Sequence, residues 1–497
     1  MRSRRTTIAI ASAAALVALG AAFRRSRLAG PINRTTRAGR NLELARLGVA
    51  VGSTFASTNA RKLFASAERR AELDERLHLR TAEQVAERLG NMKGALMKVG
   101  QMASYLDDGL PEPVRQALAQ LQAGAPPMSG ELAAEVIERE LGAPPERLFV
   151  EWDPEPIAAA SIGQVHRAVV VDPETGQERA VAVKVQYPGV GDAIEADLAN
   201  TDLLGALLRQ GFGGLDPADM VAEIRERITE ELDYEREAAN QQRFVDFYRG
   251  HPFIRIPAVL PTLSTSRVLT CELVVGSPWQ EVLGWDQHQR DLAGETLFRF
   301  VFRSLYRMRA FNGDPHPGNY LFHGDGQVTF LDFGLVRYFS AEELRVFESM
   351  VESAAVHHDA AAFRRIVEDA GLLRRGAPVP TDEAGAYFSQ FYEAVAYDRE
   401  TTWTPEYASS IVRHTFDRSS PIAQYATIPR AFVFIQRINL GLYALLGDLG
   451  ATGNFRRMAE ELWPFAHGAP STPMGEAEAT WLATRADVSD SAPSRRP

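Results

Sequence analysis

The stretch RAFNGDPHPGN at residues 309–319 places Asp314 five positions before Asn319. In a second stretch, VTFLDFGL at residues 328–335, Asp332 directly follows a mainly apolar run. Phosphoryl transfer needs a carboxylate that orients the attacking hydroxyl and oxygen ligands that hold Mg²⁺. Asp314 is therefore our candidate for the catalytic carboxylate, and Asn319 and Asp332 are the candidate metal ligands. Taken alone, each pattern also fits an ordinary turn or a strand cap.

A cation for the phosphates is available in VAVKV, where Lys184 lies among valines of a predicted strand. A charged amine in an apolar strand needs a partner, unless it faces water at the edge of the sheet. Protein kinases give this lysine a glutamate from a helix and the α- and β-phosphates of the nucleotide. The segment after residue 216 offers several acidic candidates: Glu230, Glu231, Asp233, Glu235 and Glu237. A solvated acidic helix face would also explain these residues.

The secondary structure that must position these side chains differs between segments of the chain. Helical spacing of apolar residues predicts helices within 34–125, and alternation predicts strands over 147–171 and 178–188, joined by a hairpin turn. One long helix is predicted over 216–249, followed by strands over 254–276. From about residue 285 the chain is mostly helical, with a buried helix at 431–447.

This order predicts an α+β fold with two lobes and a cleft between them. We expect an N-terminal segment at 1–30, a helical extension at 31–128, an N-terminal lobe at 129–275 and a C-terminal lobe at 276–465. Residues 466–497 are expected to form a disordered tail.

Composition narrows the classes of function. The 497 residues carry a net charge of −10, so no basic footprint indicates a nucleic-acid partner. The single cysteine, Cys271, excludes a disulfide within the chain, and its apolar surroundings predict a small core residue.

The N-terminal segment at residues 6–23 contains no charged residue and is flanked by Arg2, Arg4 and Arg5 before it and by Arg24, Arg25 and Arg27 after it. As a helix it would be about 27 Å long, just enough to cross the bilayer core. A transmembrane helix that leaves the main body in the cytoplasm is our expectation. A peripheral arm and a cleaved signal peptide remain alternatives.

The loop expected over the phosphates lacks the usual glycines. It reads PIAAASIGQVHRA, with Ala158, Ala159 and Ala160 where glycines would be and Ser161 directly after them. This alanine-rich loop resembles that of the UbiB-like (AarF-type) atypical kinases. KVGQ, from Lys98 to Gln101, and ELDYERE, with Glu231 and Asp233, are similar to the K-x-G-Q and E-x-D signatures of that family. The resemblance covers roughly residues 80–450.

The resemblance implies a protein-kinase-like fold whose N-terminal extension lays Lys98 and Gln101 across the site where a protein substrate would bind. ATP and Mg²⁺ are the implied cofactors, with Lys184 on the phosphates. We prefer Glu237 as the partner of Lys184, because Glu231 belongs to the E-x-D signature. Further nucleotide contacts are implied for the loop at 158–161, for Glu231 and Asp233, and for the hinge at Glu272 and Val274.

We therefore predict a membrane-associated atypical kinase or ATPase of the cell membrane. The γ-phosphate would pass to water or to a lipid or isoprenoid acceptor, in support of isoprenoid-quinone or lipid metabolism. One alternative is a non-catalytic, nucleotide-binding scaffold for membrane lipid or quinone enzymes. Another is a true protein kinase, against which the KVGQ helix argues. The sequence leaves the acceptor and the oligomeric state open.

Overall fold

A computed structural model describes residues 128–490, apart from residues 161, 174, 191–229, 231, 314, 417–419 and 428. All of the described residues belong to the second of two compact units of the chain, Met92–Pro497. The predicted N-terminal segment, and all but residue 128 of the predicted helical extension, lie outside the described residues.

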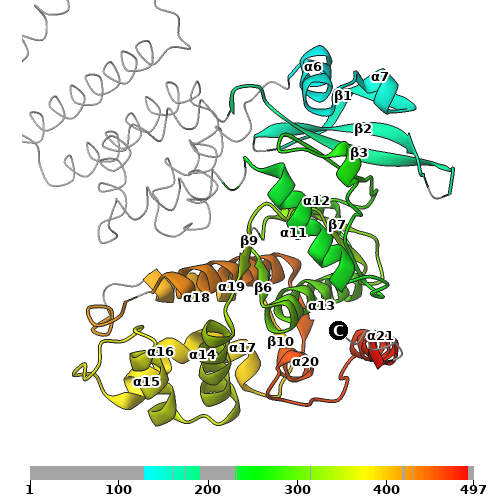
Figure 1. The fold of residues 1–497 in the computed structure, drawn as a ribbon. Coiled ribbons are helices and arrows are strands. Elements are labelled where there is room, and N and C mark those ends of the chain that lie inside the picture. Colours follow the sequence, from blue (N-terminus) through cyan, green and yellow to red (C-terminus); the bar gives the residue numbers. More distant parts are fainter. Residues whose placement is uncertain are drawn as a thin grey trace, which may run out of the picture. The chain divides into compact units, whose positions relative to one another are not determined.

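The N-terminal lobe is built on a four-stranded antiparallel sheet in the order β1-β2-β3-β5 (Figure 1). Its strands are β1 (Glu151–Ala159), β2 (Gly163–Val171), β3 (Glu178–Gln186) and β5 (Val268–Glu272). Helices α6 (Gly130–Leu141) and α7 (Pro145–Leu148) precede the sheet. Val181, Val183 and Val185 of β3 lie in one buried cluster with Val136 and Ile137 of α6, as expected of a sheet with a covered face. The predicted hairpin is confirmed.

Helix α11 (Tyr234–Phe247) follows the segment 191–229, which is not described. Asp233 has an extended backbone, with φ −110° and ψ 94°, and its side chain accepts hydrogen bonds from the N–H groups of Glu235 and Arg236. The prediction of one continuous helix over 216–249 is therefore wrong at Asp233. An aspartate competes for main-chain N–H groups, and here it starts a new helix as the N-cap residue.

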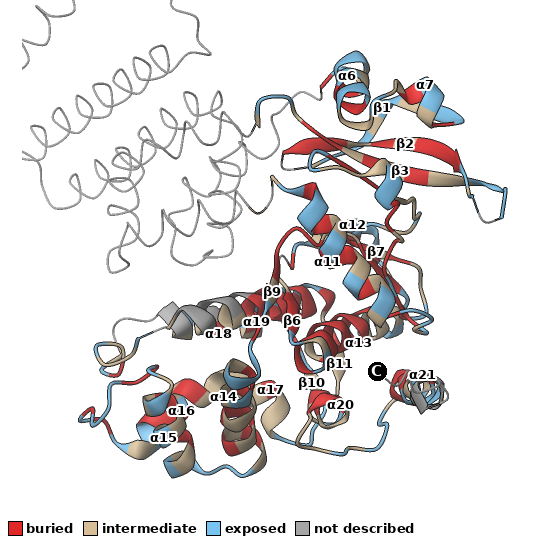
Figure 2. Ribbon diagram, in the orientation of Figure 1, coloured by how far each residue is buried: buried red, intermediate tan, exposed pale blue. Residues whose placement is uncertain are grey.

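Helix α13 (Gln287–Arg303) is the central helix of the C-terminal lobe, because every residue from Ala293 to Val301 is buried (Figure 2). It runs on into a π-helical turn at Ser304–Met308. The other helices and helical turns of this lobe are α12 (Trp279–Val282), α14 (Ala341–Val351), a second π-helical turn (Glu352–Val356), α15 (Ala360–Asp369), α16 (Thr381–Ser389), a 3-10 turn (Gln390–Tyr392), α17 (Glu393–Ala396), α18 (Pro405–Phe416), α19 (Arg430–Leu449) and α20 (Phe455–Leu462).

The predicted buried helix at 431–447 is confirmed as α19, whose Leu442 and Leu446 belong to the main hydrophobic cluster. Within the described part of the chain, no helix has both the length and the apolar composition that a membrane span requires.

Short strands carry the predicted catalytic segments. Strand β4 (Ile254–Arg255) pairs in parallel with β8 (Val328–Phe330), which pairs with β7 (Tyr320–Phe322). Strand β6 (Ala310–Asn312) pairs with β9 (Val336–Tyr338), and β10 (Thr401–Thr402) pairs with β11 (Thr452–Gly453). Two 3-10 turns, Pro261–Leu263 and Pro317–Asn319, complete the elements. Strand β4 precedes the predicted lobe boundary at 275, yet it joins the sheet that leads to Asp332.

The predicted disordered tail is wrong for residues 473–490, which form helix α21 (Pro473–Asp490). Met474 and Trp481 of this helix are buried in the main cluster. Met474 and Trp481 are seven positions apart in the sequence and therefore lie on one helix face. Residues 491–497 lie outside the described part of the chain.

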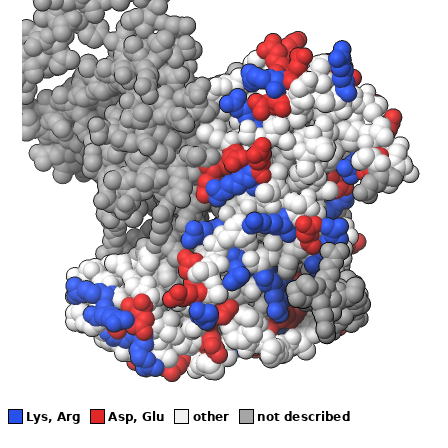
Figure 3. Space-filling model, viewed as in Figure 1, with Lys and Arg blue, Asp and Glu red and all other residues white. Residues whose placement is uncertain are grey.

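Acidic and basic side chains lie interspersed on the face of the molecule shown in Figure 3. Ion pairs between exposed side chains also occur among the described residues, such as Arg167–Glu151 at 3.0 Å. Such exposed pairs each add little to the stability of the fold.

Candidate nucleotide site

Lys184 and Glu237 form an ion pair between the sheet and α11. The Lys184 Nζ donates hydrogen bonds to both carboxylate oxygens of Glu237, each at 2.9 Å. The side chains are only 20% and 4% exposed. The Lys184 Nζ also lies 4.8 Å from the centre of the Tyr234 ring. Burial alone would lower the pKa of Lys184, but the charge of Glu237, helped by Asp332, holds it well above its usual range. Lys184 is therefore a permanent cation.

The start of α11 is fixed to the strand that carries Lys184. The Gln186 side chain, two residues beyond Lys184 on β3, donates to the carbonyl oxygens of Leu232 at 2.8 Å and of Ser266 at 3.2 Å. The N–H of Tyr234 donates to the same Ser266 carbonyl at 3.1 Å. These bonds bring the first turn of α11 against the sheet, so that Glu237 reaches Lys184.

Asp332 lies two residues after the end of β8, where two other segments meet it. Its Oδ1 accepts a hydrogen bond from the N–H of Gly334 at 2.9 Å, and its carbonyl oxygen accepts one from the Asn312 side chain at 2.6 Å. The N–H of Leu331 donates to the Asn319 carbonyl at 3.0 Å. The structure thus brings residue 319 next to the Asp332 segment.

Gly334 shows how close this segment comes to α11. A Cβ added to Gly334 would lie 3.4 Å from the Asp332 Oδ1 and 3.7 Å from the Glu237 Oε2. The two carboxylates therefore flank Gly334 on the same side as Lys184. An amine, two carboxylates and the amide of Asn319 are suitable groups for a magnesium nucleotide.

Helix α11 contacts the Asp332 segment through further groups. The Asn240 side chain donates to the Phe333 carbonyl at 3.1 Å and accepts from the Tyr338 hydroxyl, also at 3.1 Å. The buried Phe333 ring lies 4.9 Å from that of Phe244. A movement of α11 would therefore also move Asp332.

The alanine-rich loop joins β1 to β2 at the outer edge of the sheet. Ala158 and Ala159 end β1 and are exposed, and the N–H of Ala160 donates to the Gly163 carbonyl at 2.9 Å. A Cβ on Gly163 would come within 2.3 Å of the Val185 carbonyl oxygen, so this position requires glycine. The loop is consequently held against the residue that follows Lys184.

The predicted hinge follows β5. The Glu272 side chain is engaged by Arg255 of β4, and the N–H of Leu273 donates to the Ala180 carbonyl at 3.1 Å. Val275 is 84% exposed. The N–H of Glu272 donates to the Ala258 carbonyl at 2.8 Å, so both the carboxylate and the N–H of Glu272 are already engaged.

Five predicted site residues lie outside the described part of the chain: Lys98, Gln101, Ser161, Glu231 and Asp314. The residues next to Asp314 are firmly held, because the N–H of Gly313 donates to the Leu335 carbonyl at 2.6 Å and Asn312 pairs with Val336 in the β6–β9 ladder. Asp233 is described, and it caps α11. No group of three or more His, Cys, Asp or Glu side chains that could hold a metal occurs among the described residues.

Sequence reasoning missed three residues of this site: Tyr234, Asn240 and Asn312. Each belongs to a segment that was singled out, but a lone tyrosine or asparagine carries no pattern of its own. Asn240 follows Glu237 by three positions, hence on the same helix face, and this spacing could have drawn attention to it.

The two lobes, the lysine–glutamate pair and the D-F-G segment define a protein-kinase-like fold. Within this class, the family model described as the ABC1 atypical kinase-like domain matches residues 120–367, and the chain belongs to this family of atypical kinases. The resemblance to UbiB-like kinases is thereby confirmed.

Curated relatives include atypical kinase COQ8B, mitochondrial, of Rattus norvegicus, which is 36% identical over 55% of this chain and 51% of its own length. Atypical kinase COQ8, mitochondrial, of Saccharomyces cerevisiae is 28% identical, covering 58% of this chain and 56% of its own. The chain thus spans about half the length of these relatives. A solved structure, the complex of Rv3197 with erythromycin from Mycobacterium tuberculosis, has a TM-score of 0.58 and 31% identity, covering 79% of this chain and 98% of that one.

Proposed function

We propose that this chain binds Mg²⁺-ATP between its two lobes and transfers the γ-phosphate to water or to a lipid or isoprenoid acceptor at a membrane. The observation that carries the proposal is the double hydrogen bond between Lys184 and Glu237, with Asp332 next to it. A charged amine held in this way is ready to bind phosphate oxygens without rearrangement.

Each residue has a defined task in this proposal. Lys184 binds the α- and β-phosphates, and Glu237 fixes its position. Asp332 and Asn319 hold Mg²⁺, while Asp314 orients the acceptor hydroxyl. The bound Mg²⁺-ATP supplies the transferable phosphoryl group and part of the charge neutralisation. The protein supplies positioning, which accounts for most of the rate enhancement in phosphoryl transfer.

The neighbouring segments would bind the rest of the nucleotide. The alanine-rich loop, from Ala158 to Ser161, lies over the phosphates, and main-chain groups of the hinge at Glu272 and Val274 contact the base. Glu231 and Asp233 complete the site together with Lys98 and Gln101 of the KVGQ segment. Their positions relative to ATP are part of the proposal.

We further propose that the chain supports isoprenoid-quinone or lipid metabolism and associates with the cell membrane through residues 6–23, with the body in the cytoplasm. The charge-free segment with its arginine flanks supports this placement. Two of the relatives named above are described as mitochondrial, and Protein ACTIVITY OF BC1 COMPLEX KINASE 1 of Arabidopsis thaliana as chloroplastic.

A non-catalytic nucleotide-binding scaffold is the second candidate. It is favoured by the Lys184–Glu237 pair, which provides a cation for phosphates and does not by itself require turnover. Phosphorylation of other proteins is a third candidate, which the KVGQ resemblance disfavours.

The test is phosphate release and binding of Mg²⁺-ATP by the full chain, with and without vesicles of mixed neutral and anionic phospholipids. Asp332→Asn should weaken the metal-dependent binding of ATP, and slow phosphate release, each by at least about tenfold. The variant should still fold, because an amide oxygen can accept the Gly334 hydrogen bond. Asp325→Asn is the matched control, since Asp325 lies in the β7–β8 turn with φ 48°, a conformation that asparagine tolerates.

Binding without turnover, with and without vesicles, would favour the scaffold. If Mg²⁺-ATP bound equally well to Asp332→Asn and to the unmodified chain, the role assigned to Asp332 would be wrong.

A further inference from the structure

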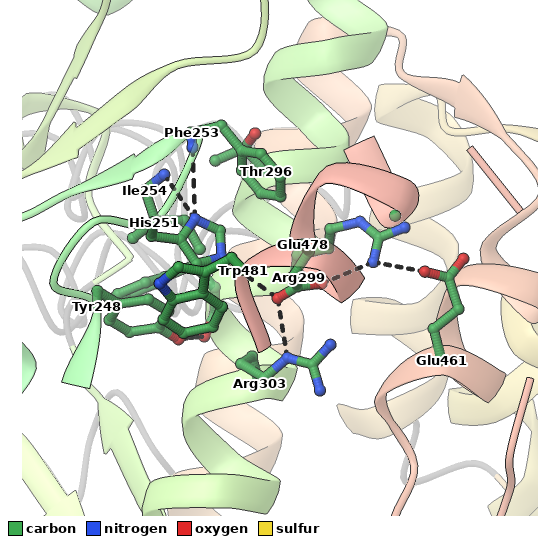
Figure 4. A network of polar contacts seen from close by, with 12 residues as sticks. Tyr248, His251, Phe253, Ile254, Thr296, Arg299, Arg303, Glu461, Glu478 and Trp481 are labelled. Atoms are coloured by element: carbon green, nitrogen blue, oxygen red, sulfur yellow. Dashed lines mark hydrogen bonds and ion pairs between the residues drawn. The ribbon is translucent and has the colours of Figure 1, made fainter. Parts of the chain in front are cut away.

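A buried cluster of charged side chains joins α21 to α13 (Figure 4). The Glu478 carboxylate accepts hydrogen bonds from Arg299 and Arg303, each at 2.9 Å. The three side chains are between 0% and 2% exposed. Arg299 also pairs with Glu461 at 2.9 Å and with Glu295 at 2.7 Å. An ionic cluster at this depth fixes one orientation of α21, because any other would leave a buried charge without a partner.

His251 extends this cluster to the loop after α11. Its Nδ1 accepts hydrogen bonds from the N–H groups of Ile254, at 3.1 Å, and Phe253, at 3.4 Å. The proton of the neutral ring must then be on Nε2, which lies 3.4 Å from the Glu478 Oε1 and donates to it. The carboxylate of α21 is thus connected through one imidazole to the main chain at the start of β4.

Trp481, one turn further along α21, holds the other side of the same loop. Its indole N–H donates to the Arg249 carbonyl at 3.0 Å. Its ring lies 4.4 Å from His251 and is parallel to Tyr248 within 9°, at 6.3 Å. Arg485 places its guanidinium 5.7 Å from the Phe247 ring and donates to the Phe247 carbonyl.

The loop at residues 248–253 connects the two elements that carry the carboxylates of the nucleotide site. Before it lies α11 with Glu237. After it lies β4, whose partner β8 leads directly to Asp332. The Tyr248 hydroxyl is additionally bonded to Ser304, at 2.7 Å, at the end of α13. One loop therefore sets the position of both elements. Helix α21 contacts this loop through Glu478 and Trp481, and it contacts the last residue of α11 through Arg485.

We propose that α21 is a positioning element of the nucleotide site. Glu478 and Trp481 hold the 248–253 loop, and through it they keep Glu237 against Lys184 and Asp332 next to both. Neither residue touches the site itself. Loss of α21 docking would free the far end of α11 while the N-cap at Asp233 still holds its start, so the helix would pivot and the ion pair would open. As regards nucleotide affinity, this inference rests on the proposed function.

The experiment compares Trp481→Phe and Glu478→Gln with Thr484→Ala in the full chain. Phenylalanine keeps an aromatic ring but loses the bond to Arg249. Thr484→Ala is the matched control, since its hydroxyl bonds only to the Trp481 carbonyl within α21 among the contacts described. Two properties are measured: amide hydrogen exchange over residues 234–247 and 328–334, and affinity for Mg²⁺-ATP.

We expect faster exchange in both segments and a weakening of Mg²⁺-ATP binding by about three- to thirtyfold in the two test variants, with no change in the control. Should Glu478→Gln fail to fold, Trp481→Phe provides the result alone. If α21 had only a structural role, Trp481→Phe and Glu478→Gln would lower the melting temperature but leave amide exchange over 234–247 and affinity for Mg²⁺-ATP unchanged. That result would overturn the inference. If the unmodified chain binds no Mg²⁺-ATP, the proposed function fails, while the exchange measurement still decides the role of α21.

Discussion

At the scale of single residues, the ion pair of Lys184 and Glu237 makes each partner dependent on the other. Lys184→Met leaves the Glu237 carboxylate buried without its counter-charge, and we expect a loss of about 1–3 kcal/mol in unfolding free energy. Adding Glu237→Gln should restore part of this stability, because burying a neutral amide costs much less free energy than burying an ionised carboxylate. Denaturant unfolding of the two single variants and the double variant measures the coupling. Strictly additive losses would show that the two side chains do not depend on each other.

The same pair shows what the sequence could predict about the site. The valines around Lys184 made it a candidate, but a lysine that faces water at the edge of a sheet fitted the same pattern. The choice of Glu237 among five acidic residues needed the family resemblance, and the structure has Glu237 in contact with Lys184. Asn312 could not be found, because its bond to the Asp332 carbonyl depends on the pairing of β6 with β9, which no local pattern encodes.

At the scale of elements, the beginning of α11 determines where Glu237 lies. The Asp233 side chain satisfies two N–H groups of the first turn. Asp233→Ala should lower the stability of the chain by about 1 kcal/mol, whereas Asp233→Asn should retain most of it, since asparagine is an equally good N-cap. Thermal melting of both variants tests this expectation. Equal losses in the two variants would indicate that the charge of Asp233, rather than its capping bond, is what matters.

The predictions for the segments that contain α11 and α21 were wrong for different reasons. Helical periodicity continued across Asp233, so the break was not visible until the cap geometry was known. For α21, the composition resembled a disordered tail because the helix is held mainly by buried charges and one tryptophan. The strands β1–β3 were predictable because alternation is a local property, whereas docking through Glu478 depends on arginines about 175 residues away.

At the scale of the whole described region, the buried His251 should make the stability of the fold depend on pH. Burial is the main cause that lowers the pKa of His251 below its usual 6.5, and the charges of Arg303 and Arg299 act in the same direction, against the hydrogen bond and charge of Glu478. Tyr248 and Trp481 face the ring from the remaining sides. Burial would raise the pKa of Glu478, but His251, Arg303 and Arg299 together hold it well below 4.5. The ring is therefore neutral and the carboxylate ionised in the folded chain.

As the pH falls through about 6.5, the unfolded chain takes up a proton at His251 that the folded chain does not, so stability decreases. A second decrease follows below about 4.5, where Glu478 is protonated in the unfolded chain first. The buried His166 shifts in the same direction and adds to the first decrease. His251→Gln isolates the contribution of His251, because a glutamine amide can still donate to Glu478 but does not titrate. Melting temperatures between pH 7.5 and 5.5 should fall less steeply in this variant than in the unmodified chain, and identical slopes would exclude His251 as a source of the pH dependence.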